Sequence, residues 1–498
     1  MSTRSPAGRN TLILTITNII NRSLGFVFRI VLVRLAGQEA IGLYQMMHPI
    51  FFIFLVIATA GIPIAVSKLV AEYRAQNRPA LVSVVLRTSL TLALALGLAA
   101  NLLLFALSGL LSREVLGEPR TQLALLLMAP SMPLLALTAA FRGYFQGIEQ
   151  IKVVSTALLV EELTHIIACL GFIRLLAGGG PSAISAGLAA AGFIEEAAGL
   201  IVYLLAYTVY RPRVPAGEPQ VSLLAMASHL LRTATPTTAT RLVHSLSQLL
   251  QSVLIPSGLR VAGYTSSQAA IAFGELTGMA LNLLFIPSMF TISLATTLLP
   301  QLTNAIARSS PREAAAAFLR ALKWASFISL PCSALLITLG EPACLFLFAS
   351  RSAGRLLQLL AWGGVLLYTQ QISAAALQGL GRPSLPMFSS ILGTAASAGL
   401  LPRLTASHGM EGAAVAVMIG MAVNGAAGLS MVQARLPFLQ QWLPWLLRTG
   451  IAAVACGYTA HTIYLWCLPT MSSLLSMLLA GPAALLVYFL ACKLVRAI

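Results

Sequence analysis

Hydrophobic residues occur in long runs along this chain, and charged or Gly/Pro-rich breaks separate the runs. A helix needs about 20 apolar residues to cross a bilayer, and most of the runs reach that length. Apolar and polar residues do not alternate within them, so they predict helices rather than the strands of a membrane barrel. The pattern predicts fourteen spans: 11–35, 43–67, 81–111, 121–147, 152–176, 183–210, 234–256, 270–303, 315–348, 355–378, 384–403, 410–434, 444–466 and 472–494.

The first predicted span carries a polar stripe in which Arg22 and Arg29 lie two helical turns, or ~10 Å, apart. An arginine at membrane depth costs ~3 kcal/mol on insertion scales, so this face is expected to meet a cavity or a partner rather than lipid. For Arg29 the alternative is a position near one interface, from which its guanidinium reaches the headgroups. The stripe steps by four and three residues through Thr11, Thr15, Asn18, Arg22, Gly25 and Arg29.

The two halves of the chain are related. The seventh span carries its own polar stripe of Thr237, Arg241, His244, Gln248 and Ser252. Landmarks recur at similar offsets: Arg22 and Arg241 at 219 residues, Gly42 and Gly274 at 232, Pro63 and Pro300 at 237, and Gln146 and Gln378 at 232. These offsets predict a six-helix unit that is used twice in parallel orientation, followed by two additional helices.

Composition supports an all-α polytopic membrane protein. Of 498 residues, 58% are hydrophobic and 9% charged, and the mean hydropathy is +0.87. The net charge of +17 lies singly or in small groups between the apolar runs, which is typical of cytoplasmic loops and not of a nucleic-acid-binding surface. The six cysteines have no CxxC spacing, so we expect reduced thiols and no metal site.

Loop charge predicts the orientation. One set of loops is richer in Lys and Arg, so both termini are expected to lie in the cytoplasm of a multi-pass protein of the cell membrane. The first helix is expected to be retained, because no cleavage site follows a short apolar core. Four parts are predicted: a lobe at 1–210, a linker with an amphipathic helix at 211–233, a second lobe at 234–435, and two helices at 436–498.

No motif in the chain is typical of an enzyme, and no cofactor is expected. P-loop, nucleophile-elbow and metal-ligand patterns are absent from the sequence. The candidate site is a cationic cavity in which Arg22, Arg29 and Arg241 bind phosphate. Guanidinium groups bind phosphates through paired hydrogen bonds. Further candidates for substrate contact or gating are Asn18, Arg142, His244 and Gln248.

Five glutamates are predicted to be buried, and two explanations of them stay open. They could form ion pairs that hold the bundle together, or they could neutralise the arginines in the empty state and take up a coupling ion. The membrane potential is the alternative driving force. Glu275 is the leading candidate for neutralising the arginines or taking up a coupling ion. The adjacent pair Glu161 and Glu162, with His165 one turn further along the helix, could titrate. The five are Glu161, Glu162, Glu195, Glu196 and Glu275.

Several segments resemble the stage V sporulation protein B family. They are NRSLGFVFRIVLVRLAGQEAIGLYQMMHPI at the first span, FRGYFQGIEQ, FGELTGMALNLLFIP with SLATTLLPQL, and LQGLGRPSLP. That family belongs to the multidrug/oligosaccharidyl-lipid/polysaccharide exporter superfamily, beside the lipid II flippases. The resemblance covers nearly the whole chain. Arg22 sits at the matching place of the flippases' first-helix motif, whereas Phe28-Arg29 stands where they have an Arg-Asp pair.

The resemblance implies fourteen helices in two lobes around a central cavity, alternating access, and a lipid-linked oligosaccharide precursor of the cell wall as cargo, during spore cortex synthesis. The last two helices would line a groove for the lipid tail, and membrane lipids and cell-wall synthases are the implied partners. Two alternatives stay open: a cation-coupled exporter of drugs or organic cations, and a non-transporting scaffold for cell-wall synthases. A cationic cavity disfavours the exporter, because it repels cations.

The predicted orientation can be tested by cysteine labelling from outside the cell. Because the loops rich in Lys and Arg stay inside, reagent should reach positions near Gly179 and His408 and miss positions near Glu218 and Ser310. The reverse pattern would contradict the predicted topology.

Overall fold

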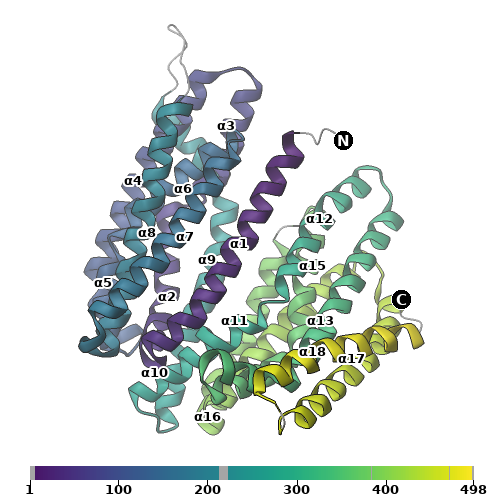
Figure 1. Cartoon of the computed structure of the whole chain (residues 1–498). Coiled ribbons are helices and arrows are strands. Elements are labelled where there is room, and N and C mark those ends of the chain that lie inside the picture. The colour runs from purple at the N-terminus through teal and green to yellow at the C-terminus, as the bar shows by residue number, and fades with distance from the viewer. Residues whose placement is uncertain (1–5, 212–221, 383, 470, 496–498) are drawn as a thin grey trace. The chain divides into compact units, whose positions relative to one another are not determined.

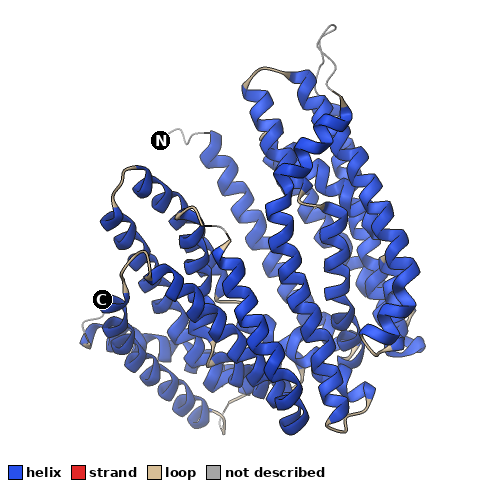
Figure 2. Ribbon diagram, turned by 180° about the vertical axis from the view of Figure 1, so that it is seen from behind, coloured by secondary structure: helices blue, strands red, loops and turns tan. Residues whose placement is uncertain are grey.

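The computed structural model describes residues 6–211, 222–382, 384–469 and 471–495. Figure 2 shows this described part as helices joined by short loops, and none of its residues forms a strand. The chain divides into two compact units, Met1–Val253 and Leu254–Ile498. The all-α fold class predicted from the sequence is confirmed.

The N-terminal unit is a bundle in which α7 packs along α8 and α4 packs along α6. Figure 1 shows α4, α6, α7 and α8 side by side. One tight break separates α2 from α3 within the second span, where Ala60 and Gly61 have positive φ. The helices are α1 (Pro6–Ala36), α2 (Gln38–Thr59), α3 (Ile62–Ala75), α4 (Pro79–Leu110), α5 (Gln122–Met128), α6 (Ser131–Gly147), α7 (Ile151–Leu175), α8 (Gly180–Tyr210) and α9 (Leu223–Val261).

The C-terminal unit contains the remaining helices and the last part of α9, from Leu254 onward. A π-helical segment, η4 (Glu275–Ala280), lies between α10 and α11, and α16 is two helices joined at Gly409, whose φ of 58° and ψ of −137° are not helical. The helices are α10 (Ser266–Gly274), α11 (Leu281–Leu284), α12 (Ser288–Ala307), α13 (Pro311–Phe348), α14 (Arg351–Ala361), α15 (Gly364–Gly379), α16 (Leu385–Gln433), α17 (Leu439–Cys467) and α18 (Ser473–Leu494).

Every predicted span coincides with one helix, with consecutive helices or with one half of α16. Among the described residues, seven helices are long and apolar enough to cross a membrane, and nine are if each bent pair counts as one span. Neither α1 nor α9, which carry the polar stripes, is among the seven. The segment 221–232 is predicted to be a separate amphipathic helix, but from Leu223 onward it is continuous with the seventh span in α9, while 212–221 lie outside the described residues. The four-part domain division stays a prediction.

The same glycine contact occurs once in each unit. A Cβ added to Gly147 of α6 would lie 2.7 Å from Val70 Cβ of α3, so the two helices touch only because this residue is glycine. A Cβ added to Gly379 of α15 would lie 3.0 Å from Leu302 Cβ of α12. Both residues of the second contact follow those of the first by 232 positions, so the two units repeat one packing design.

Turns between helices repeat at the same interval. Pro79 and Pro311 begin long helices, and the residues two positions earlier have matching positive φ. Three pairs of turn residues are separated by 232 positions and share positive φ: Asn77 and Ser309 (53° and 54°), Gly117 and Ala349 (62° and 53°), and Glu149 and Gly381 (62° and 72°). By contrast, the landmark pairs Pro63–Pro300 and Arg22–Arg241 are not separated by 232 positions.

The first helix packs on α7. Asn21 Nδ2 donates a hydrogen bond to Leu158 O at 3.0 Å, and a Cβ at Gly25 would lie 3.1 Å from Glu162 Oε1. Residue numbers rise together along both helices, so α1 and α7 run parallel, as expected for the first and fifth of a series of alternating spans. The contact levels are Asn21 with Leu158, Gly25 with Glu162, and Phe28 with His165, whose rings meet edge to face.

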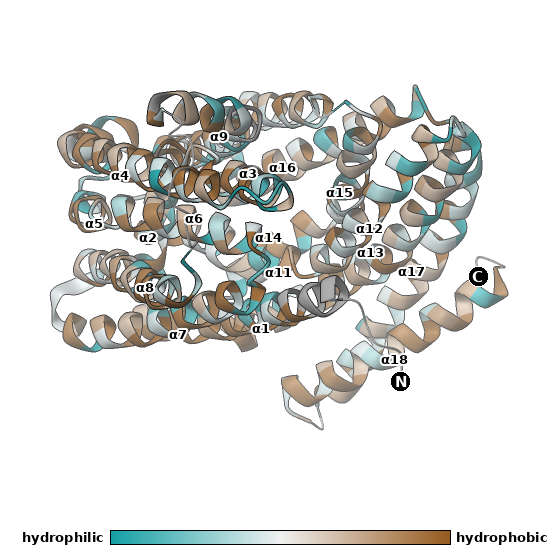
Figure 3. Cartoon of the chain, turned by 90° about the horizontal axis from the view of Figure 1, so that it is seen from above, coloured by the Kyte–Doolittle hydropathy of each residue, from teal (hydrophilic) through white to brown (hydrophobic). Residues whose placement is uncertain are grey.

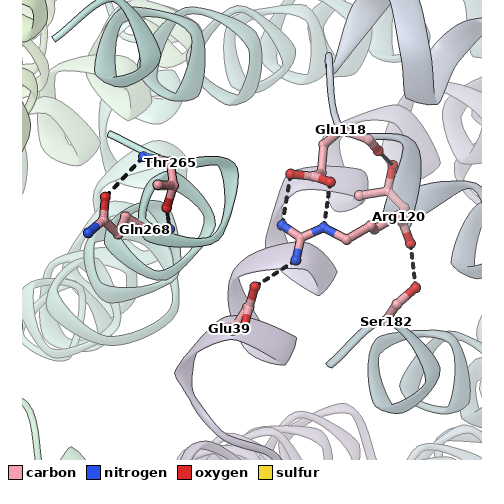
Figure 4. Close-up of polar contacts among 7 residues, drawn as sticks. Glu39, Glu118, Arg120, Ser182, Thr265 and Gln268 are labelled. Atoms are coloured by element: carbon pink, nitrogen blue, oxygen red, sulfur yellow. Dashed lines mark hydrogen bonds and ion pairs between the residues drawn. The ribbon is translucent and has the colours of Figure 1, made fainter. Parts of the chain in front are cut away.

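A cluster around Arg120 joins one end of the N-terminal unit (Figure 4). Its guanidinium binds Glu118 through two hydrogen bonds of 2.7 and 3.0 Å and Glu39 through one of 2.6 Å. Ser182 Oγ donates to Arg120 O at 2.8 Å. Because Glu39 and Ser182 lie in the first turns of α2 and α8, this cluster fixes the start of two of the helices that border the cavity described below.

The last two helices pack as a pair on α13. Tyr488 OH donates to Phe327 O at 3.0 Å, and Trp442 Nε1 donates to Ser326 Oγ at 3.1 Å. Their other faces are apolar and exposed, with Trp466 81% accessible, and Figure 3 shows hydrophobic residues along α18. Such faces are suited to lipid contact.

Replacing Gly147 by alanine should destabilise the protein, because the new methyl group would overlap Val70 Cβ at 2.7 Å and Ser67 O at 2.8 Å. Overpacking of this kind costs about 1–3 kcal/mol. Thermal unfolding in detergent, followed by tryptophan fluorescence, should show a lower apparent melting temperature.

Gly171→Ala is the matched control, because Gly171 is also helical but a Cβ there meets nothing within 4 Å. It should leave the melting temperature unchanged or raise it, since alanine favours helix. Equal behaviour of the two variants would contradict the close contact.

Candidate functional site

A cavity of about 850 Å³ lies within the N-terminal unit, between α2, α3, α6, α8 and α9. Its lining combines apolar side chains from α2, α3 and α6 with charged and amide side chains from α6, α8 and α9. This combination suits a ligand with an apolar part and a polar part. The apolar lining residues include Phe52, Leu55, Val56, Ile64, Leu135 and Ala139, and the polar ones Arg142, Gln146, Glu196, Arg241, His244, Ser245 and Gln248.

Arg142 reaches the cavity from α6, and it is held by Glu161 of α7. Arg142 Nη2 donates to Glu161 Oε2 at 2.9 Å. The Glu161 side chain is 7% exposed and that of Arg142 is 32% exposed, so the guanidinium, not the carboxylate, faces the open space. A buried carboxylate needs such a partner, because charge is costly at low dielectric.

The position of Glu161 depends on Gly199 of α8. A Cβ at Gly199 would lie 2.2 Å from Glu161 Oε1 and 2.6 Å from its Cγ. Only glycine therefore leaves room for this carboxylate between α7 and α8. Gly199 is not among the site residues predicted from the sequence, because a glycine in an apolar helix gives no sign of which side chain it faces.

Glu196 adds a carboxylate to the cavity wall three residues before Gly199 on the same helix. Its Oε2, like Glu161 Oε1 and Arg142 Nε, has no hydrogen-bond partner among the described residues. Buried polar atoms are rarely left this way. The polar group around Arg142 is therefore incomplete and can accept a further donor or acceptor.

Helix α9 supplies the other cationic side of the cavity. Arg241, His244 and Gln248 recur at helical spacing on one face, and all three line the cavity. Gln248 Nε2 lies 2.9 Å from His244 Nε2, so the two side chains share a hydrogen bond. All three are among the site residues predicted from the sequence, and they line one cavity with Arg142.

The polar stripe of α1 lies elsewhere. Arg29 interacts electrostatically with Tyr44 of α2 and Glu162 of α7, and it is not among the cavity-lining residues. Arg22 and Asn18 are exposed on α1 and do not line the cavity either. The structure therefore brings Arg241 together with Arg142 at this cavity, and not with Arg22 or Arg29.

The remaining glutamates belong to two other places. Glu195 Oε2 lies 2.9 Å from His165 Nδ1, which makes a second ion pair between α7 and α8 when the imidazole is protonated. Glu162 lies against Gly25 of α1. Glu275 is in the C-terminal unit, where it accepts a hydrogen bond of 2.6 Å from Ser350 Oγ at the start of α14.

The fold and this cavity define a class: a multi-pass helical membrane protein built from a repeated bundle with a charged cavity. Solved structures share the fold. A lipid II flippase MurJ in an inward closed conformation has a TM-score of 0.72 and 16% identity, covering 97% of this chain and 98% of its own. An inward-facing MATE family transporter of the MOP superfamily has a TM-score of 0.71 and 18% identity, covering 87% and 99%.

The sequence profile of the polysaccharide biosynthesis protein family matches residues 7–305, and the chain belongs to this family. The MatE profile matches 244–402. Stage V sporulation protein B of Bacillus subtilis (strain 168) is 27% identical over 461 residues, which cover 91% of this chain and 89% of that protein. The resemblance to the stage V sporulation protein B family is thereby confirmed.

Replacing Gly199 by alanine tests the cavity's ion pair. The new methyl group should displace the Glu161 carboxylate from Arg142. We expect this to lower the free energy of unfolding by about 1–3 kcal/mol and the apparent melting temperature with it. Gly192→Ala on the same helix is the matched control, because a Cβ there meets nothing within 4 Å. A Gly199→Ala protein as stable as this control would show that the carboxylate needs no such space.

Proposed function

We propose that this protein moves a lipid-linked cell-wall precursor, a lipid II-like undecaprenyl-diphosphate glycan, across the cytoplasmic membrane. The observation that carries the proposal is the pair Arg142 and Arg241 at one cavity of a chain with this family membership. Guanidinium groups bind diphosphates through paired, charge-assisted hydrogen bonds. The solved lipid II flippase with the same fold supports this cargo class.

The charge of the cavity wall favours an anionic headgroup over a cationic drug. Two arginines and one glutamate are among its lining residues, and Glu161 lies behind Arg142, so Arg241 is the guanidinium left without a carboxylate partner among the described residues. The apolar lining residues of α2, α3 and α6 can accept the first part of a lipid chain. The exposed apolar faces of α17 and α18 would accompany the rest of the chain in the bilayer.

Alternating access completes the proposal. The cavity would open in turn to each side of the membrane, with both termini in the cytoplasm as loop charge predicts. Arg22 and Arg29 would contact cargo in a state that brings α1 towards the headgroup. The likeness to stage V sporulation protein B supports a role in spore cortex synthesis.

Arg241→Ala and Arg22→Ala are expected to impair flipping of a fluorescent lipid-linked diphosphate in proteoliposomes. Each loses one charge-assisted contact, worth ~1.5–3 kcal/mol, or roughly ten- to a hundred-fold in affinity. Arg241→Lys should retain partial activity, because it keeps the charge without the planar fork. Arg113→Ala, at an exposed arginine of the same unit, is the control and should flip normally.

Complementation in cells depleted of their lipid II flippase would extend this test. A scaffold without transport activity predicts no flipping by the wild-type protein in proteoliposomes. Well-expressed Arg22→Ala and Arg241→Ala proteins that flip at the normal rate would refute the phosphate site.

A further inference from the structure

The cavity described above is balanced in charge when empty. Arg142 and Arg241 contribute two positive charges, and Glu161 and Glu196 contribute two negative charges when ionised. Glu161 neutralises Arg142 directly at 2.9 Å. Among the described residues, Arg241 has no carboxylate within ion-pair distance.

A diphosphate that joins a lipid to a sugar would upset this balance. Such a headgroup carries roughly two negative charges, one for each phosphorus. If it entered with both glutamates ionised, the cavity would hold two uncompensated negative charges away from bulk water, which is costly. The phosphate and Glu161 would also compete for one guanidinium.

The geometry leaves both carboxylates able to accept a proton. Glu161 is 5% exposed and its Oε1 lacks a hydrogen-bond partner among the described residues, and Glu196 Oε2 lacks one too. Neither oxygen would lose an existing hydrogen bond on forming an O–H group. Glu196 borders the cavity, so its proton can come from cavity water.

We propose that Glu161 and Glu196 are internal counter-ions of Arg142 that become protonated when an anionic headgroup binds. The headgroup takes the place of Glu161 at the guanidinium, and each carboxylate forms one O–H bond with a proton from water. Release of the headgroup reverses both steps. This inference rests on the proposed function, and it makes cargo binding a proton-linked event.

Other charged and titratable groups lie around this site, and several have partners of their own. His165 is paired with Glu195 at 2.9 Å, and Glu162 faces Gly25 and interacts with Arg29. His244 shares a hydrogen bond with Gln248 one turn further along α9, and Tyr203 interacts with Arg142 itself. Groups on the surrounding helices are Arg29 on α1, Tyr44 and His48 on α2, Arg142 on α6, Glu162 and His165 on α7, Glu195 and Tyr203 on α8, and Arg241 and His244 on α9.

Titration calorimetry of the purified full chain with a farnesyl-diphospho-sugar tests the proposal. The diester phosphates of this probe stay ionised throughout, so the probe takes up no protons itself. Binding to wild type, measured in buffers of different ionisation enthalpy, should consume about one to two protons per probe. Because binding takes up protons, affinity for the probe should fall as pH rises, about tenfold per pH unit for each proton taken up, over roughly pH 6 to 8.

Glu161→Gln and Glu196→Gln should each reduce the proton uptake, and the double variant should abolish both the uptake and the pH dependence. Glu72→Gln is the control: it removes an exposed carboxylate of the same unit that does not line the cavity, and it should keep the wild-type uptake. If Glu161→Gln fails to fold, proton uptake by Glu196→Gln can still be compared with that of wild type.

Wild-type binding without proton uptake would overturn the counter-ion proposal and leave the proposed function standing. Uptake that both single variants and the double variant retain would also overturn it. Absence of probe binding by well-folded wild type at every pH would instead overturn the proposed function, and the counter-ion role with it.

Discussion

Charge placed at membrane depth is the constraint on which the arrangement of the N-terminal unit depends. Water is scarce there, so a charged side chain needs a partner, a cavity or both. Arg142 has both: Glu161 at 2.9 Å on one side and a cavity on the other. Gly199 is the geometric condition for this pair, because any larger residue would occupy the space of the carboxylate. The close approach of α7 and α8 and the pairing of Glu161 with Arg142 therefore both depend on Gly199.

The repeated glycine contacts show how the bundle holds its functional helices. Gly147 and Gly379 allow α6 and α15 to touch α3 and α12, each in its own unit, at equivalent positions. Without a strong hydrophobic drive between helices in lipid, close packing at small residues supplies much of the association. In the N-terminal unit this contact fixes the end of α6, and Arg142 lies just over one turn before it. The scaffold and the cavity thus share a helix.

Family membership and cavity chemistry support the same functional class by separate routes. The family profile covers residues 7–305, which include every charged residue of the cavity. The fold alone is shared by a lipid II flippase and by a MATE family transporter, so it does not select a cargo. The selection rests on the predominance of arginine at the cavity wall, which suits an anionic headgroup. The carboxylates then matter as the counter-ions that any such anion must displace.

The sequence by itself determined the helices, because a bilayer demands long apolar runs and every predicted span has its counterpart in α1 to α18. It also identified the repeat and the candidates Arg142, Arg241, His244 and Gln248. Only the tertiary structure decided which of these meet. Periodicity places a residue on a helix face, but the neighbour of that face depends on how the helices pack. Hence Arg29 lies near Glu162, Arg241 shares a cavity with Arg142, and Glu275 bonds to Ser350.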